Sequence, residues 1–223
     1  MGETIKIAGA DGFEFAAWHE PSFTPRKGGV IVIQEIFGID EHVRADVERW
    51  AKMGYEAIAP AMFDRREPGF LAHHDPDGIK AGVAHAMGTP MDQAMGDIAA
   101  CRDFLLSRGP KVCVVGYCYG GSLAWMAAGK VEGLAAASSY YGSMVQANAA
   151  LALNCPTIVH LGRTDGGIPA DDVAAAVGEH HPGTPVHVYE GAGHGFNNES
   201  PERYNAEAAD LARHRTLELF DKA

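Results

Sequence analysis

Residues 111–122 constrain the fold more than any other stretch of the sequence. Within them, the β-branched run Val112–Val115 predicts a buried strand, and a glycine-flanked turn follows it without a spacer. Gly116 and Gly120 are small because the turn brings the backbone of the strand close to that of a following helix, where a Cβ would collide. The stretch therefore predicts a strand, a sharp turn and a helix in direct succession.

Cys118 lies at the centre of this turn. In the pattern Gly-x-Nuc-x-Gly, a strained turn between strand and helix raises one side chain above the carboxyl edge of a sheet. The first turn of a helix favours a thiolate over a thiol, and the N–H of Tyr119 is placed to stabilise an oxyanion. We therefore interpret Cys118 as a nucleophile. The alternative, a small buried residue, suits the cysteines that have no such turn around them, namely Cys101, Cys113 and Cys155.

The length and composition predict a single domain that spans residues 1–223. With 223 residues, 47% of them hydrophobic, the chain can bury one sizeable core. The sequence has no long apolar run, and its first residues lack the apolar segment of a signal peptide. Four cysteines without paired spacing are typical of reduced thiols in the cytoplasm. We therefore expect a soluble, cytoplasmic protein, and we expect it to be a monomer.

The charge argues against two classes of partner. The formal net charge is −11, from 18 basic and 29 acidic residues, and the basic residues are scattered. Nucleic acids and anionic membranes bind clustered positive charge. We expect neither a nucleic acid nor a membrane as a partner.

The rest of the chain predicts alternating strands and helices. A hairpin comes first (4–8 and 13–18), followed by strands at 30–33, 56–62, 112–115, 134–141, 157–161 and 186–189 and helices at 41–53, 91–108, 122–129, 170–180 and 201–220. Residues 64–90 show no regular period, and we interpret them as an irregular excursion that forms a pocket rim or lid. The pattern predicts an α/β fold, a mostly parallel sheet with an antiparallel N-terminal hairpin and helices on both faces.

Four residues with reactive side chains follow predicted strands: Glu35, Cys118, Asp165 and His194. Folds of this class bind ligands beyond the carboxyl ends of their strands. The order nucleophile, acid, histidine is that of α/β-hydrolases. In such a triad His194 withdraws the proton of Cys118 and returns it to the leaving group, while Asp165 fixes the imidazole tautomer. The sequence therefore predicts a triad of Cys118, His194 and Asp165.

Two of these carboxylates have alternative interpretations. Asp165 could be a turn residue, but Asp171 and Asp172 are expected in the first turn of a helix, which leaves Asp165 as the acid. A carboxylate at a strand end, such as Glu35, is usually solvated or caps a helix. Its position equally suits a partner for the resting thiol, with the N–H of Ile36 as a second oxyanion donor. From the residues alone, the role of Glu35 stays open.

Most of the eleven histidines are interpreted as ordinary surface residues. His194 differs through its place after the last strand. The others assigned to the surface are His19, His42, His85, His160, His180, His181, His187 and His214. Adjacent histidines at His73 and His74 suggest a metal cluster, but such pairs on a loop without a second cluster are more often solvated. We expect no metal site.

Several of these segments together closely resemble the dienelactone hydrolase (carboxymethylenebutenolidase) family: Gln34-Glu35-Ile36-Phe37-Gly38, Gly116-Tyr117-Cys118-Tyr119-Gly120-Gly121, Tyr140-Tyr141-Gly142, Asp165 and Gly193-His194-Gly195-Phe196. The resemblance extends over nearly the whole chain and implies the α/β-hydrolase fold. It implies that Cys118, Asp165 and His194 form the triad and that Glu35 holds the thiol until substrate displaces it. It also implies hydrolysis of an enol-lactone through an acyl-cysteine, without a cofactor.

The resemblance is weaker at substrate recognition. Dienelactone-cleaving members bind the substrate carboxylate with two arginines, one of them a few residues beyond the catalytic histidine. Residues 195–199 contain no arginine, and Arg65, Arg66 and Lys80 cannot be aligned with the other. A neutral amide loses the bidentate, charge-assisted contact of an arginine. We therefore expect an ester other than dienelactone, and the candidate substrate contacts are Phe37, Tyr141 and Asn198.

The sequence thus predicts a cysteine-dependent hydrolase of a small ester or lactone. An alternative is a non-catalytic protein that keeps the fold and a reactive cysteine for ligand binding or redox sensing. The presence of both Asp165 and His194 argues against that alternative, because a binding protein has no need of an acid that fixes a tautomer.

Overall fold

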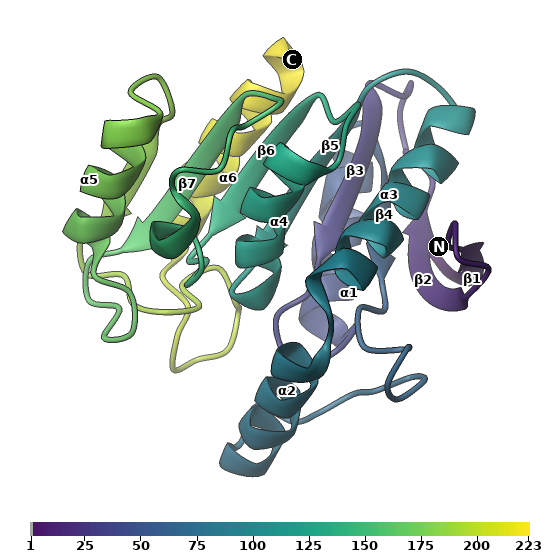
Figure 1. Cartoon of the computed structure of the whole chain (residues 1–223), viewed down its shortest axis with the longest axis horizontal. Helices are drawn as coiled ribbons and strands as arrows, with labels where there is room; N and C mark the ends of the chain where they lie inside the picture. Colours follow the sequence, from purple (N-terminus) through teal and green to yellow (C-terminus); the bar gives the residue numbers. More distant parts are fainter. Residues whose placement is uncertain (1) are drawn as a thin grey trace. The chain divides into compact units, whose positions relative to one another are not determined.

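A computed structural model describes residues 2–223. The described chain forms two compact units, one that ends at Val114 and one that runs from Val115 to Ala223. Each unit contains strands flanked by helices (Figure 1). The single domain expected from the sequence stays a prediction.

The first unit contains four strands in the order β1-β2-β4-β3. Their bounds are β1 (Glu3–Ala8), β2 (Glu14–Glu20), β3 (Gly28–Ile33) and β4 (Tyr55–Pro60). β1 and β2 form the predicted antiparallel hairpin, whose turn is closed by a hydrogen bond from the Gly12 N–H to the Gly9 carbonyl (2.9 Å). β2 is also antiparallel to β4, whereas β3 and β4 are parallel. Every residue of β3 and β4 is buried.

Three helices complete this unit: α1 (Glu41–Lys52), α2 (Pro76–Gly88) and α3 (Met91–Ser107). α1 begins where the sequence predicts it, because the Asp40 side chain accepts a hydrogen bond from the Val43 N–H (2.9 Å). Its buried face includes Val43, Val47 and Trp50. This helix and the hairpin confirm the sequence interpretation of the N-terminal part of the chain.

Residues 64–90 are more regular than the sequence analysis predicts, because they contain helix α2. Asp75 caps this helix through the Gly78 N–H (2.8 Å), and Pro76 occupies its first turn. Its buried residues are only Gly78 and Gly82. A Cβ at Gly82 would lie 2.1 Å from the carbonyl oxygen of Ile36, so glycine allows a close backbone contact there. A helix that packs through glycines shows no apolar period, and for this reason the pattern did not reveal it.

The second unit contains β5 (Val112–Tyr117, which starts just before the boundary), β6 (Ala136–Tyr140), β7 (Thr157–Gly162) and β8 (Val186–Tyr189), in that order in the sheet. β6, β7 and β8 pair in parallel. The helices are α4 (Tyr119–Lys130), the 3₁₀ turn η1 (Gln146–Asn148), α5 (Ala170–His180) and α6 (Ala206–Lys222). Figure 1 shows α4 and α6 on opposite faces of these strands. The predicted mostly parallel sheet with helices on both faces is therefore confirmed.

α6 begins five residues later than the sequence predicts. Residues 201–203 form a turn, and Asn205 caps the helix by accepting a hydrogen bond from the Ala208 N–H (3.1 Å). Over the described residues, none of the helices combines the length and the apolar character that crossing a bilayer requires.

Candidate active site

The turn between β5 and α4 places Cys118 at the N-terminus of the helix. Cys118 has φ 54° and ψ −111°, a left-handed conformation that costs a non-glycine residue free energy. A Cβ at Gly116 would lie 1.9 Å from the Gly120 carbonyl oxygen, which confirms the close backbone approach expected there. The N–H of Cys118 donates to the carbonyl of Tyr140 at the end of β6 (3.0 Å). The strained turn is therefore fixed to the neighbouring strand.

The three predicted triad residues come together in the second unit. Cys118 follows β5, Asp165 follows β7 and His194 follows β8. The Nε2 of His194 is hydrogen-bonded to the Sγ of Cys118 (3.1 Å), and its Nδ1 to the Oδ2 of Asp165 (2.7 Å). Three segments far apart in the sequence thus form one continuous hydrogen-bonded chain of sulfur, imidazole and carboxylate.

The electrostatics of this chain favour a charged imidazole. Burial alone would raise the pKa of Asp165, but hydrogen bonds from His194 and from the Gly167 N–H (2.9 Å) lower it below its ordinary value. Burial alone would lower the pKa of His194, but the hydrogen bonds to Asp165 and Cys118 raise it to about 10. At neutral pH the arrangement therefore favours the imidazolium form of His194 beside the carboxylate of Asp165.

Two further predicted site residues lie beside the triad. Tyr119 is the first residue of α4, and N–H groups in the first turn of a helix have no acceptor within the helix. Tyr141, with φ 38°, is fully buried, and its ring centroid lies 5.1 Å from that of His194. The position of Tyr119 suits an oxyanion donor, and Tyr141 forms a wall next to the imidazole.

Asn198 has a contact within its own loop. It is 2% exposed, and its Oδ1 accepts a hydrogen bond from the Ser200 N–H (3.2 Å), while its own N–H donates to the Gly195 carbonyl (2.8 Å). These bonds shape the loop that carries His194. A substrate contact of Asn198 stays a prediction.

Glu35, Ile36 and Phe37 lie in the first unit, directly after β3. Glu35 is 3% exposed, and Phe37 stacks on the ring of His74 with a centroid distance of 3.9 Å. Gln34, to which the sequence interpretation gave no role, donates to the Glu35 carbonyl (3.2 Å) and accepts from the Met62 N–H (3.2 Å). Gln34 therefore fixes the segment that carries Glu35 to the end of β4. The catalytic and substrate-binding roles of Glu35, Ile36 and Phe37 stay predictions.

The histidine pair that suggested a metal has other contacts. The Nε2 of His74 is hydrogen-bonded to Asp40 (2.8 Å), and Asp75 is the cap of α2. Within residues 2–223, no group of three His, Cys, Asp or Glu side chains has a metal-binding arrangement.

Two histidines assigned to the surface are buried, which corrects the sequence interpretation. His19 is 4% exposed and His160 is fully buried. His160 lies within β7, whose six residues are all buried, and that uninterrupted apolar setting was the available signal. Both side chains have polar partners, which is how an interior accommodates an imidazole.

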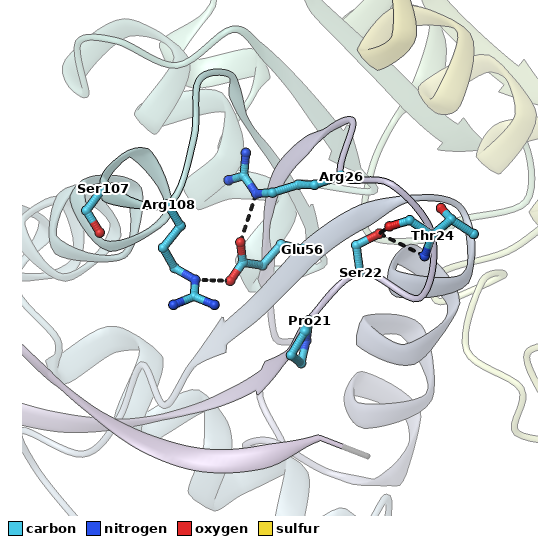
Figure 2. Close-up of a pocket in the computed structure, with 7 residues that line it drawn as sticks. All are labelled: Pro21, Ser22, Thr24, Arg26, Glu56, Ser107 and Arg108. Atoms are coloured by element: carbon cyan, nitrogen blue, oxygen red, sulfur yellow. Dashed lines mark hydrogen bonds and ion pairs between the residues drawn. The ribbon is translucent and has the colours of Figure 1, made fainter.

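The first unit has a hollow of about 500 Å³, drawn in Figure 2, and none of the triad residues is among those that line it. Its central group is the buried carboxylate of Glu56, which accepts hydrogen bonds from Arg26 Nε (2.8 Å) and Arg108 Nε and is bonded to His19 (2.8 Å). Burial alone would raise the pKa of Glu56, but these partners lower it. The cluster joins β2, β4 and the end of α3, and we assign it a structural role.

Comparison with known proteins shows which family the chain belongs to. The profile of the dienelactone hydrolase family matches residues 15–223. A carboxymethylenebutenolidase of Pseudomonas putida is 33% identical over 232 residues, which cover 99% of this chain and 96% of the relative. The crystal structure of a Klebsiella pneumoniae protein assigned to the dienelactone hydrolases superposes with a TM-score of 0.87 at 28% identity, covering 100% of this chain and 99% of that one. An α/β serine hydrolase homologue from Coxiella burnetii shares the fold, with a TM-score of 0.68 at 15% identity and coverage of 96% and 97%. The chain has the α/β-hydrolase fold and is a hydrolase that belongs to the dienelactone hydrolase family.

Proposed function

We propose that the protein hydrolyses a small ester or lactone through an acyl-cysteine intermediate. The observation that supports this proposal is the hydrogen-bonded chain Cys118–His194–Asp165. The thiolate of Cys118 attacks the carbonyl carbon, and the resulting oxyanion accepts a hydrogen bond from the Tyr119 N–H. The imidazolium of His194 then gives its Nε2 proton to the leaving alkoxide as the C–O bond breaks.

The second half of the reaction uses the same residues in the reverse sense. His194, now neutral, takes a proton from a water molecule, and the hydroxide attacks the thioester carbonyl. The C–S bond breaks, the acid is released, and thiolate and imidazolium are restored. Asp165 keeps the proton-bearing Nδ1 directed away from the sulfur and stabilises the positive charge on the ring. Glu35 as partner of the resting thiol and Ile36 as second oxyanion donor belong to the same proposal, as does a cytoplasmic monomer.

We further propose that the substrate does not need a carboxylate. Asn198 is neutral, and Arg65 of the 64–90 segment is already paired with Asp11 (2.7 Å) and Asp97 (2.7 Å). The guanidinium of Arg66 donates to the Gly88 carbonyl (2.8 Å). A cation that is held by its own carboxylate partners, as Arg65 is, contributes little to binding a second anion.

This substrate class can be tested with matched lactones that differ only in an acid group. We expect kcat/KM for the neutral lactone to equal or exceed that for its carboxylate-bearing counterpart. A rate at least about tenfold higher for the acid, which is 1.4 kcal/mol of transition-state binding, would show that a cation recognises the carboxylate. Steady-state kinetics of both compounds at several salt concentrations would decide the question.

The chemistry itself can be separated from the redox-sensing alternative by mass spectrometry. The protein is mixed with a slowly deacylating aryl ester, quenched in acid and digested. We expect the acyl mass on the peptide that contains Cys118, at a level that decays as product forms. Sulfenic acid or disulfide products at Cys118 after peroxide, with no acyl adduct after ester, would support a sensor instead.

A further inference from the structure

A buried polar cluster in the second unit converges on one hydroxyl of α6. The Oγ1 of Thr216 lies 2.9 Å from Ser138 Oγ, 3.0 Å from Tyr140 OH and 2.9 Å from His160 Nε2. All four side chains are at most 1% exposed. Buried polar groups of this kind are costly unless every donor and acceptor is matched, so their arrangement restricts where each proton lies.

The direction of the hydrogen bonds follows from Arg215, which can only donate. Its Nη1 donates to Tyr189 OH (3.2 Å), and the same hydroxyl lies 2.9 Å from His160 Nδ1. The Tyr189 proton cannot point at a guanidinium, and Nδ1 is the other described partner of this hydroxyl, which favours Nδ1 as the acceptor. Burial, followed by the electrostatic effect of His187 when it is protonated and of the Arg215 charge, holds the pKa of His160 well below its ordinary value, so the ring is neutral. Its one proton therefore lies on Nε2 and is donated to Thr216.

Two tyrosines connect this cluster to the candidate active site. Tyr140, whose hydroxyl contacts Thr216, accepts the Cys118 N–H with its carbonyl (3.0 Å). Phe196, two residues beyond His194, packs on the rings of Tyr140 and Tyr189, with centroid distances of 6.0 Å and 5.3 Å. Both tyrosines that the cluster orients thus contact the segments that carry the sulfur and the imidazole.

We propose that Thr216 and His160 are positioning residues. Through Tyr140 and Tyr189 they fix the position of the Cys118 sulfur relative to the His194 imidazole. This inference rests on the proposed function, because it concerns the same sulfur and imidazole. The hydroxyl of Thr216 fixes the Tyr140 side chain, and the Nε2–H tautomer of His160 joins Thr216 to Tyr189. Loss of the hydroxyl would release the end of β6, on which the strained conformation of Cys118 depends.

The test compares Thr216→Val, which removes the hydroxyl and keeps the shape, with Thr216→Ser, which keeps the hydroxyl. We expect Thr216→Val to lower kcat for an aryl ester roughly tenfold with little change in KM, and to slow alkylation of Cys118 by iodoacetamide. Thr216→Ser should restore both rates to within about threefold of wild type. The control is Thr157→Val, a buried threonine of β7 whose hydroxyl donates to the Cys155 carbonyl (3.0 Å), and it should leave both rates unchanged.

A spectroscopic measurement makes the inference independent of variant folding. In ¹⁵N-histidine-labelled wild-type protein at neutral pH, His160, assigned with a His160→Gln sample, should show the Nε2–H tautomer. The opposite tautomer, or wild-type kcat and alkylation in a folded Thr216→Val, would overturn the proposal. Failure of the proposed function is distinguishable, since turnover would then persist in Cys118→Ala while the tautomer and the alkylation rates still report on positioning.

Discussion

Replacing Cys118 with alanine is expected to reduce kcat/KM for an activated aryl ester by at least about 10⁴-fold. In the proposed mechanism the sulfur is the atom that forms the covalent bond, and within the second unit it is the thiol that contacts His194 (3.1 Å). Without it, no nucleophile remains next to His194 to attack the ester carbonyl. Initial rates followed by release of the aryl alcohol at saturating and subsaturating ester would measure the loss.

The controls for this experiment come from the same chain. Cys118→Ser should retain a small fraction of the activity, because an alkoxide is harder to form beside the same imidazole than a thiolate. Cys155→Ala should keep full activity, since burial raises the pKa of that thiol to about 11 and its sulfur has no imidazole partner among the described contacts. Wild-type turnover by Cys118→Ala would exclude covalent catalysis by this cysteine.

Replacing Asp165 with asparagine is expected to lower kcat by about 10⁴-fold while the protein stays folded. The carboxylate accepts the Nδ1–H of His194 (2.7 Å), and it is one of the two groups that raise the His194 pKa to about 10. An amide supplies no charge and can hold the wrong tautomer. The pKa of His194 should therefore fall, so that the ring loses its extra proton at a lower pH than in the wild type.

Two measurements test this expectation. The ring titration of His194, followed by ¹⁵N NMR, should shift to lower pH in Asp165→Asn, and Cys118 should react more slowly with iodoacetamide at pH 7. Asp171→Asn is the matched control, because the Asp171 side chain is 82% exposed in the first turn of α5 and pairs with Arg163. An unshifted His194 titration in Asp165→Asn, with near-normal kcat, would remove Asp165 from the proposed triad.

The parts of this fold that the sequence predicts well are those in which local signals agree. The run before Cys118 is apolar and β-branched, the glycines around it have one purpose, and α5 and β8 have the predicted bounds. Helix α2 was missed because its buried residues are the glycines Gly78 and Gly82. The predicted start of α6 was too early because the Asn205 cap determines the first residue of this helix. The glycines of α2 serve a tertiary backbone contact, which no local pattern encodes, whereas the start of α6 is set by a local cap that the sequence interpretation overlooked.

Some features of the candidate site could likewise be predicted from the sequence, and others could not. Its residue types and chain order predicted the convergence of Cys118, Asp165 and His194, because strand ends on one edge of a parallel sheet lie close together. The burial of His160 was not predicted, although its apolar neighbours in β7 were a usable signal; which polar groups contact its ring depends on tertiary packing. Thr216 lies on α6, and it meets His160 because that helix packs against the strands, which the local sequence does not reveal.

The backbone of Cys118 has a consequence for how such a protein can be engineered. A residue with φ 54° and ψ −111° is in a region that glycine occupies freely, so a sequence selected for thermal tolerance alone would place glycine at position 118. With cysteine at this position, backbone strain lowers the free energy of unfolding by roughly 1–3 kcal/mol, and the turn holds the sulfur next to His194. Stabilised variants of this scaffold should therefore be sought away from the turn, because the most direct gain in melting temperature at position 118 would remove the proposed nucleophile.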